Sequence, residues 1–302
     1  MQTKLSVILP VHNGMPYLPE AVESILTQTL TNFTFIIVND GSTDATGDYL
    51  RSLSDPRIVI IDQSKQGLGA SLNTGLAQCN SEYVARMDAD DVSCPNRFQE
   101  QVDYLDKHPR VVILGTQIAF LVASARQRAF PVPTDHTHIA EDLKRGIASL
   151  CHPSLMFRTD VARAAGGYPL ESYGEDFDFF LRMCEQGLAG NLDDVLFHYR
   201  LHDAQLSLAK TRQLISRYRY LAHCVTCRRM GKPEPVFQSF TEHSSVISKF
   251  MWSIEANAII HYRKGRIKLA MGHQTEGIAR LVFAGMCRPS SVFRRLRSAI
   301  SR

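Results

Sequence analysis

Carboxylates gather at two places in this 302-residue chain, and the first is the segment Met87-Asp88-Ala89-Asp90-Asp91, directly after the apolar run 83–85. Like charges so close to a buried strand repel one another and lose hydration, so a cation is expected beside them. Mg²⁺ and Mn²⁺ favour oxygen ligands of this kind. The segment therefore predicts a divalent metal site that holds a phosphate-bearing substrate. Taken alone, such an acidic triplet is more often a solvated loop than a metal site.

The second carboxylate pair, Glu175-Asp176, opens a segment whose apolar residues recur at helical spacing: Phe177, Phe180, Leu181 and Cys184. The helix dipole favours acidic residues in a first turn, and this is a sufficient structural explanation for the pair. The functional alternative is a general base, because a carboxylate at this position stays ionised and can accept a proton from a hydroxyl group. The neighbouring charges would raise its basicity.

The elements that must position these carboxylates alternate along the first 90 residues. Short apolar runs at 5–10, 33–38, 57–62 and 83–85 are separated by segments of helical periodicity, which predicts a parallel sheet with helices on both faces. Ligands of such sheets bind beyond the carboxyl ends of the strands. Those ends carry His12-Asn13, Asp40-Gly41, Gln66-Gly67 and the acidic cluster. Neither a dinucleotide-binding fingerprint nor a phosphate-binding P-loop is present.

Three segments resemble the inverting glycosyltransferases of family 2, of the kind that transfer sugars in bacterial surface-glycan synthesis. They are Ser6–Asn13, Val38–Asp44, and Ala85–Asp91 with Pro95–Arg97, and their order and spacing match over about the first 210 residues. The resemblance implies the GT-A fold, an α/β, Rossmann-like architecture with a mixed, mostly parallel sheet. It also implies a nucleotide-diphosphate sugar donor, most often UDP-linked, and Mn²⁺ or Mg²⁺ as cofactor.

The resemblance assigns the donor site to nine residues: Pro10, Val11, His12, Asn13, Asp40, Gln66, Gly67, Asn73 and Asp88. His12 stands where the family often has an aromatic ring against the base, and Asp40 would hydrogen-bond the base. Simpler structural interpretations remain open. His12 and Asn13 could be turn formers, Asp40 a helix cap and Asn73 an exposed helix residue.

The resemblance also divides the roles of the carboxylates. Asp90 would be the chief metal ligand, with Asp88 toward the ribose or a metal-bound water and Asp91 in support. Asp176 would be the general base, and Glu175 would position the acceptor or the donor sugar.

The segment Phe197–His202 resembles the closing Tyr-Arg-x-His segment of the family. His202 is accordingly a further candidate metal ligand. Arg200 could serve the diphosphate or a core ion pair.

The net charge of +4 conceals two parts of the chain with opposite net charge. Residues 1–208 hold 16 basic and 26 acidic residues, and residues 209–302 hold 18 basic and four acidic ones. We expect a catalytic domain at 1–208, with the nucleotide sugar bound by about 1–120 and the acceptor by about 121–208. A basic helical extension would occupy 209–302.

The basic extension has the features of a segment that lies on anionic membranes. Its end mixes three arginines, 294, 295 and 297, with apolar residues. Pairing with the acidic catalytic part or with another subunit is the alternative, and no nucleic-acid-binding module accompanies the charge. The absence of an apolar leader and the seven cysteines without framework spacing predict a cytoplasmic protein. Docking of the basic extension would make it peripheral on the inner face of the plasma membrane.

The resemblance, taken with these patterns, implies a metal-dependent inverting glycosyltransferase, a hexosyltransferase of polysaccharide biosynthesis at the cell envelope. It would move a sugar from a nucleotide-diphosphate donor to a hydroxyl group of a glycan or lipid-linked acceptor. The alternatives are a non-catalytic scaffold that binds nucleotide sugar and, from another enzyme class, a nucleotidyltransferase. The sequence does not specify the sugar, the acceptor, the ion or the oligomeric state, and a homodimer stays open.

Overall fold

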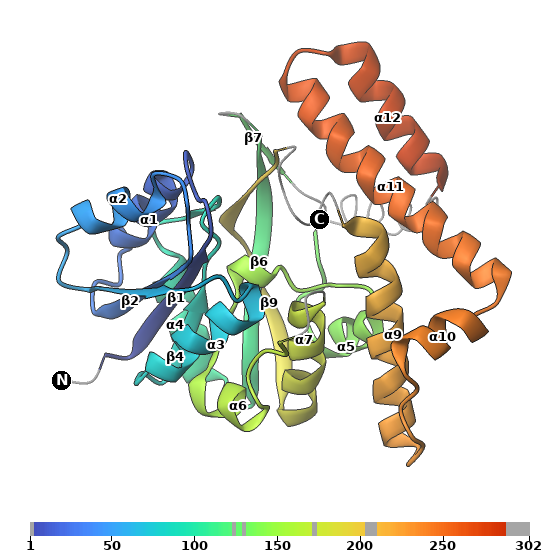
Figure 1. Ribbon diagram of the computed structural model, residues 1–302, viewed down its shortest axis with the longest axis horizontal. Coiled ribbons are helices and arrows are strands. Elements are labelled where there is room, and N and C mark those ends of the chain that lie inside the picture. The colour runs from blue at the N-terminus through green and yellow to red at the C-terminus, as the bar shows by residue number, and fades with distance from the viewer. Residues whose placement is uncertain (1–2, 123–124, 129–130, 171–173, 203–209, 288–302) are drawn as a thin grey trace. The chain divides into compact units, whose positions relative to one another are not determined.

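The computed structural model describes residues 3–122, 125–128, 131–170, 174–202 and 210–287 (Figure 1). The chain forms two compact units. The first comprises Met1–Ile118, Val132–Glu141 and Ala148–Tyr199, and the second comprises Ala119–Pro131, Asp142–Ile147 and Arg200–Arg302. The boundary predicted from charge, at residue 208, lies close to this division and stays a prediction.

The first unit is built on a mixed sheet of strand order β3-β2-β1-β4-β8-β6-β9-β5. Its parallel half consists of β1 (Leu5–Val11), β2 (Phe33–Asp40), β3 (Ile58–Gln63) and β4 (Tyr83–Arg86). The other strands are β5 (Val92–Ser93), β6 (Val111–Val122), β8 (Met156–Arg158) and β9 (Leu188–Arg200). Strand β8 runs antiparallel to both β4 and β6, and β5 runs antiparallel to β9.

Helices connect the strands in the order expected for such a sheet. They are α1 (Leu18–Leu26), α2 (Thr46–Ser52), α3 (Leu68–Gln78), α4 (Arg97–Lys107), α5 (His136–Lys144), α6 (Thr159–Ala164) and α7 (Glu175–Gln186), with the short 3₁₀ turn η1 (His152–Ser154). All seven residues of β1 are buried, which is why that strand is one continuous apolar run. Helix α1 instead buries one face, Leu18, Ala21, Val22 and Ile25, against the core.

The predicted strand-helix alternation over the first 90 residues is confirmed. Three further predictions from the sequence need correction: a cap at Ser42 or Thr43 for the helix that runs through Leu50, a strand over 152–158 and a helix over 139–147. Ser42 and Thr43 do not cap α2; the helix begins at Thr46, whose N–H donates to Asp44 Oδ1 (3.0 Å). The segment 152–158 begins with a 3₁₀ turn rather than a strand, and only its end joins the sheet. The helix expected at 139–147 lies earlier, because Gly146 with φ +68° ends it.

The second unit consists of β7 (Ala125–Arg128), α9 (Thr211–Arg229), α10 (Phe237–His243), α11 (Val246–Ala270) and α12 (Gln274–Cys287). Helices α11 and α12 form an antiparallel hairpin (Figure 1). Helix α9 is tied to α11 by Arg219, which pairs with Glu255 (2.8 Å), and by Arg212, which donates to Asn257 (2.9 Å). No described helix is long and apolar enough to cross a bilayer. The arginine-rich end, 288–302, lies outside the described residues.

Candidate active site

The acidic cluster lies just beyond β4, where the sequence places it. One ligand atom from each of Asp88, Asp90 and Asp91 lies within 4.8 Å of the others. Asp91 is buried and the other two are partly exposed. The first-strand loop adjoins the cluster, since a Cβ built on Gly14 would lie 3.6 Å from that of Ala89. Three converging carboxylates on a partly exposed edge fit the hard oxygen donor set of Mg²⁺ or Mn²⁺.

Arg86 is the cation that the protein itself supplies to the cluster. Its side chain is 2% exposed, and Nη1 lies 2.5 Å from Asp88 Oδ2. Burial raises the pKa of Asp88 and the charge of Asp90 adds to this, while Arg86 opposes both. One guanidinium against three carboxylates leaves the cluster with excess negative charge. A divalent cation would compensate that charge.

A buried polar network fixes the backbone that carries the cluster. The guanidinium of Arg97 is completely buried and donates from Nη2 to the carbonyls of Arg86 (2.9 Å) and Leu155 (3.1 Å). Its Nε donates to Gln101 Oε1 (3.0 Å), and Gln101 Nε2 donates to the carbonyl of Ser154 (2.9 Å). Burial lowers the pKa of Arg97 to about 9. These bonds join β4, α4 and the start of β8, so the strand end is rigidly positioned.

Asp40 organises the neighbouring loop at the end of β2. Its carboxylate accepts hydrogen bonds from the backbone of Gln66 (2.7 Å) and Gly67 (2.8 Å) and from Gln63 Nε2 (2.8 Å). Burial raises the pKa of Asp40, but the hydrogen bonds, Gln63 first, outweigh it and hold that pKa below its usual value. Asp40 is therefore an ionised anchor of the loop before α3 and not a cap of α2. Its predicted contact with the base stays a prediction.

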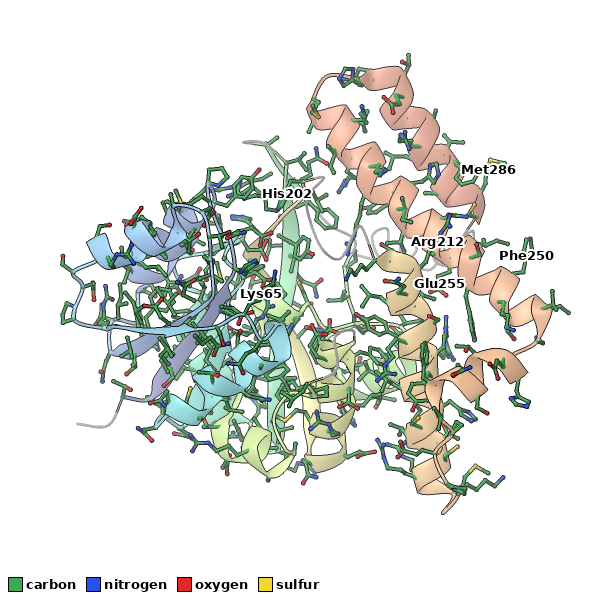
Figure 2. The ribbon with its side chains drawn as sticks, in the orientation of Figure 1. Lys65, His202, Arg212, Phe250, Glu255 and Met286 are labelled. Carbon is green, nitrogen blue, oxygen red and sulfur yellow. The ribbon has the colours of Figure 1, made fainter. Side chains whose placement is uncertain are left out.

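The loop that follows β1 is hydrogen-bonded to the loops that follow β2 and β3. His12 Nδ1 lies 2.9 Å from the carbonyl of Asp40, and its Nε2 lies 2.9 Å from Lys65 Nζ (Lys65 is labelled in Figure 2). An ammonium group can only donate, so Nε2 accepts and Nδ1–H donates to Asp40. Asn13 adopts φ +55°, and its Oδ1 accepts from the N–H of Thr43 (2.8 Å). The sequence reasoning missed Lys65, which brings a positive charge to this loop.

The preceding residues, Pro10 and Val11, are buried in β1. Their predicted place beside the nucleoside stays a prediction.

Helix α3 holds the loop that contains Tyr168 by its backbone. Asn73 Nδ2 donates to the carbonyl of Tyr168 (2.7 Å), and Asn73 Oδ1 accepts from the N–H of Tyr168 (2.8 Å). A Cβ on Gly69 would lie 2.4 Å from the carbonyl oxygen of Pro169, so only glycine permits this approach. Asn73 is thus not an exposed helix residue but a structural link. Its assignment to the donor site remains a prediction.

Glu175 and Asp176 occupy the first turn of α7, after Gly174 with φ +82°. Asp176 Oδ1 accepts from the N–H of Phe177 (2.7 Å). Burial, and next the charge of Asp176, raise the pKa of Glu175 to about 7. Smaller contributions come from Arg86, which lowers this pKa, and Asp88, which raises it. The two carboxylate groups predicted from the sequence are therefore close enough to interact, with Arg86 acting on both.

Comparisons with known proteins agree with this geometry. Residues 6–165 match the family model described as glycosyl transferase family 2. The chain belongs to glycosyltransferase family 2.

The amylovoran biosynthesis glycosyltransferase AmsE of Erwinia amylovora is 32% identical over 206 residues, which is 65% of this chain and 75% of AmsE. Among solved structures, TarS of S. aureus in complex with UDP-GlcNAc superimposes with a TM-score of 0.59 at 16% identity, covering 93% of this chain and 89% of that one. The mannosyltransferase PcManGT from Pyrobaculum calidifontis, in complex with GDP-Man and Mn²⁺, gives 0.60 at 16% identity, covering 96% and 88%. The predicted GT-A fold and glycosyltransferase class are confirmed.

This family 2 glycosyltransferase also has a buried layer that the sequence reasoning missed. His152 Nε2 lies 3.1 Å from the hydroxyl oxygen of Tyr168, whose ring stacks on Phe179 with centroids 4.2 Å apart. Burial and the charge of Arg86 lower the pKa of His152 well below its usual value, so this imidazole is neutral. Burial raises the pKa of Tyr168. The layer is buried, and it lies close enough to Arg86 for that charge to act on both His152 and Tyr168.

No periodicity in the sequence identifies this layer, because its members come from η1, a loop and α7. The one sequence signal near this layer is the pair Gly166-Gly167, which is typical of a turn and directly precedes Tyr168. In the structure both glycines have positive φ angles.

The closing segment spans the division between the two units: its residues 197–199 belong to the first, and Arg200 to His202 belong to the second. Arg200 is the last residue of β9, and His202 follows it (His202 is labelled in Figure 2). Their predicted contacts with the metal and the diphosphate stay predictions.

Proposed function

We propose that this enzyme transfers a sugar from a nucleotide-diphosphate donor, in the first instance a UDP-sugar, to a hydroxyl group with inversion at the anomeric carbon. The observation that carries the proposal is the convergence of Asp88, Asp90 and Asp91 within 4.8 Å, under the influence of Arg86 and beside a second carboxylate pair. The UDP-GlcNAc complex of TarS and the GDP-Man and Mn²⁺ complex of PcManGT support a donor of this class.

On the donor side, we assign the nucleoside to the loops after β1, β2 and β3. Asp40 accepts three hydrogen bonds from the protein and, as an ionised carboxylate, has lone pairs for one more donor, such as a base N–H. His12 offers a ring face for stacking. Lys65 supplies a positive charge that suits an anionic ligand.

Asp90, Asp88 and Asp91 would hold Mn²⁺ or Mg²⁺, with Asp90 as the chief ligand. When bound, such an ion neutralises the negative charge that grows on the departing diphosphate. His202 is proposed as an additional ligand and Arg200 as a diphosphate contact. Arg86 orients Asp88 toward this site through the 2.5 Å ion pair.

On the acceptor side, Asp176 is the proposed general base. Inverting transfer needs a hydroxyl group aligned opposite the leaving diphosphate and a carboxylate that accepts its proton. Position in the first turn of α7 stabilises an ionised Asp176. Glu175, with its pKa near 7, is suited to donate or accept a hydrogen bond with a sugar hydroxyl.

We further propose that the acceptor is a growing surface glycan or its lipid-linked precursor, as the name of the relative AmsE suggests. A cytoplasmic enzyme whose residues 209–302 contact an anionic membrane surface would meet such an acceptor where it is made. The charge of that segment supports this assignment.

A thermal-shift screen of UDP- and GDP-sugars, each with Mg²⁺, Mn²⁺ or a chelator, tests the proposal. We expect one nucleotide series to raise the melting temperature only with the metal, because a ligand that binds the native state stabilises it. Slow donor hydrolysis under the same conditions would distinguish an enzyme from a scaffold that binds without reacting. Stabilisation by no nucleotide sugar in either metal would refute the donor assignment.

A further inference from the structure

We propose that the α11–α12 hairpin carries an apolar edge that inserts into the surface of an anionic lipid bilayer. The proposal deepens the membrane association proposed above by naming the side chains that enter the lipid. It does not depend on the identity of the sugar donor. It rests on the exposure of apolar residues in this hairpin and on the charge around them.

One face of helix α11 carries a row of mostly apolar or small residues, here called the seam, which extends beyond the part that packs against α12. Its members recur at alternating spacings of four and three, the pattern of one helix face: Ile247, Met251, Ile254, Ala258, His261 and Gly265. Helix α12 covers the end of the seam, where the rings of His261 and Phe283 lie 4.5 Å apart. A Cβ on Gly265 would lie 3.1 Å from the carbonyl oxygen of Gly277.

The beginning of the same seam is exposed. Ile247 is 75% exposed and Met251 is 55% exposed, and their neighbour Phe250 is 63% exposed. Because the seam is packed at one end and open to solvent at the other, we infer that another apolar surface binds the open end.

Helix α12 adds a second apolar stripe on its outer side. Ile278, Val282 and Met286 are spaced at i, i+4 and i+8, so they lie on one face, and each is more than half exposed. Figure 2 shows Met286 and Phe250 projecting from the same side of the hairpin. The uncovered seam of α11 and the outer stripe of α12 are together called the apolar edge of the hairpin. Soluble proteins rarely leave such an edge open unless it binds something.

The charge of the second unit indicates which kind of surface binds the apolar edge. Residues 209–302 hold 18 basic and four acidic residues, and three of the four acids are already paired within the second unit: Glu234 with Arg228, Glu255 with Arg219, and Glu276 with Arg280. A second copy of the chain would bring like charge against like charge. Anionic lipid headgroups instead complement the basic excess.

The bilayer also suits the exposed lysines of α11. They are Lys249, whose Nζ donates to the carbonyl of Glu242 (3.3 Å), and Lys264 further along the helix. A lysine can lay its aliphatic stem along the apolar surface while its ammonium group reaches the headgroups. An interfacial helix combines these two features.

The test is co-sedimentation of the full chain with vesicles of phosphatidylcholine alone or with phosphatidylglycerol added. We expect binding to the anionic vesicles, weaker at high salt. The double variant Phe250→Ser/Met286→Ser should bind roughly tenfold more weakly or worse, since two large apolar side chains no longer leave water. Met230→Ser is the matched control, because Met230 is 60% exposed but lies at the end of α9, and it should bind as the wild type.

Equal vesicle binding by the double variant and the Met230 control would overturn the proposal, as would the absence of wild-type binding to anionic vesicles. Sedimentation velocity tests the competing explanation, that the apolar edge is an interface between two copies of the chain. A wild-type dimer that the double variant converts to monomer, without an effect on vesicles, would identify the edge as an interface between copies and refute lipid insertion.

Donor hydrolysis in solution separates this proposal from the catalytic one. The double variant should keep that activity, and Asp90→Ala should lose it while binding vesicles normally. Unchanged melting of the double variant by circular dichroism shows that its fold is intact.

Discussion

At the scale of single residues, Arg86 is the side chain that connects the two acidic groups of the site. It pairs with Asp88 at 2.5 Å and lowers the pKa of Glu175, and its carbonyl accepts a bond from the buried Arg97. Because it is almost fully buried, its charge cannot be replaced by water.

We expect Arg86→Gln to lower the free energy of unfolding by on the order of 3 kcal/mol in the absence of metal, because it leaves Asp88 without its compensating charge. Arg86→Lys keeps a positive charge and should lose less. Urea denaturation measures both. Adding Mn²⁺ should recover more stability in the Gln variant than in the wild type. Equal losses for Lys and Gln would mean that Arg86 acts through packing alone.

Glu175 should give the stability of the metal-free protein a specific pH dependence. Its pKa is raised from 4.5 to about 7, so between these values the unfolded chain has lost a proton that the native protein keeps. Its contribution to stability is therefore greatest below pH 4.5 and declines as the pH rises toward 7.

Glu175→Gln removes this dependence and should stabilise the protein at pH 8 by on the order of 1 to 3 kcal/mol relative to the wild type, with no gain at pH 4. Thermal denaturation across this range provides the measurement. A gain that is the same at both pH values would indicate that ionisation of Glu175 is not responsible.

At the scale of elements, apolar runs were enough to predict β1, β2, β3 and β4. Strands β1, β2 and β4 are almost completely buried, as is typical of a parallel sheet, whereas β3 lies at the edge of the sheet and is only partly buried. Strand β9 was not predicted, since Gly190, Asn191 and two aspartates interrupt its apolar pattern. The cap of α2 was assigned to the wrong residue because several adjacent side chains could have served. Local sequence does not distinguish among such candidates.

The same limit applies to the site. The carboxylates were found because charge clustered after a strand is unusual in itself. Arg86, His152 and Tyr168 were not assigned roles, since the charge of Arg86 acts on two residues that are more than 60 positions away along the chain. The contact between His152 and Tyr168 joins residues only 16 positions apart, but no periodic pattern connects them. Asn73 was assigned to the donor from the resemblance, and its bonds to Tyr168 add a structural reason for an asparagine there.

Within α12, two glycines should respond oppositely to alanine. A Cβ on Gly277 would lie 2.6 Å from the side chain of Leu269, whereas a Cβ on Gly285 meets no atom within 4 Å. Gly285→Ala should therefore raise stability by about 0.5 to 1 kcal/mol through helix propensity. Gly277→Ala should lower it, because the hairpin must move apart. Chemical denaturation of the two variants makes the comparison, and stabilisation by both would contradict the close packing of α11 and α12.

At the scale of the whole molecule, the chain combines an acidic unit that carries the site with a strongly basic helical unit. The first has the GT-A fold of its family and presents carboxylates at the carboxyl edge of a parallel sheet. The second has no role in the proposed chemistry beyond the closing segment with Arg200 and His202. Its exposed apolar edge suggests that it determines where the enzyme works rather than what it does.

Calorimetric titration of nucleotide diphosphate into the wild type, Asp90→Ala and Asp176→Asn, with and without Mn²⁺, tests the central claim most directly. The acidic cluster should bind the donor, and Asp176 should accept the proton of the acceptor hydroxyl group. Both variants should lose transfer activity, yet only Asp90→Ala should lose the metal-dependent part of nucleotide binding, while Asp176→Asn binds as the wild type does. Equal loss of nucleotide binding in the two variants would contradict this division of roles.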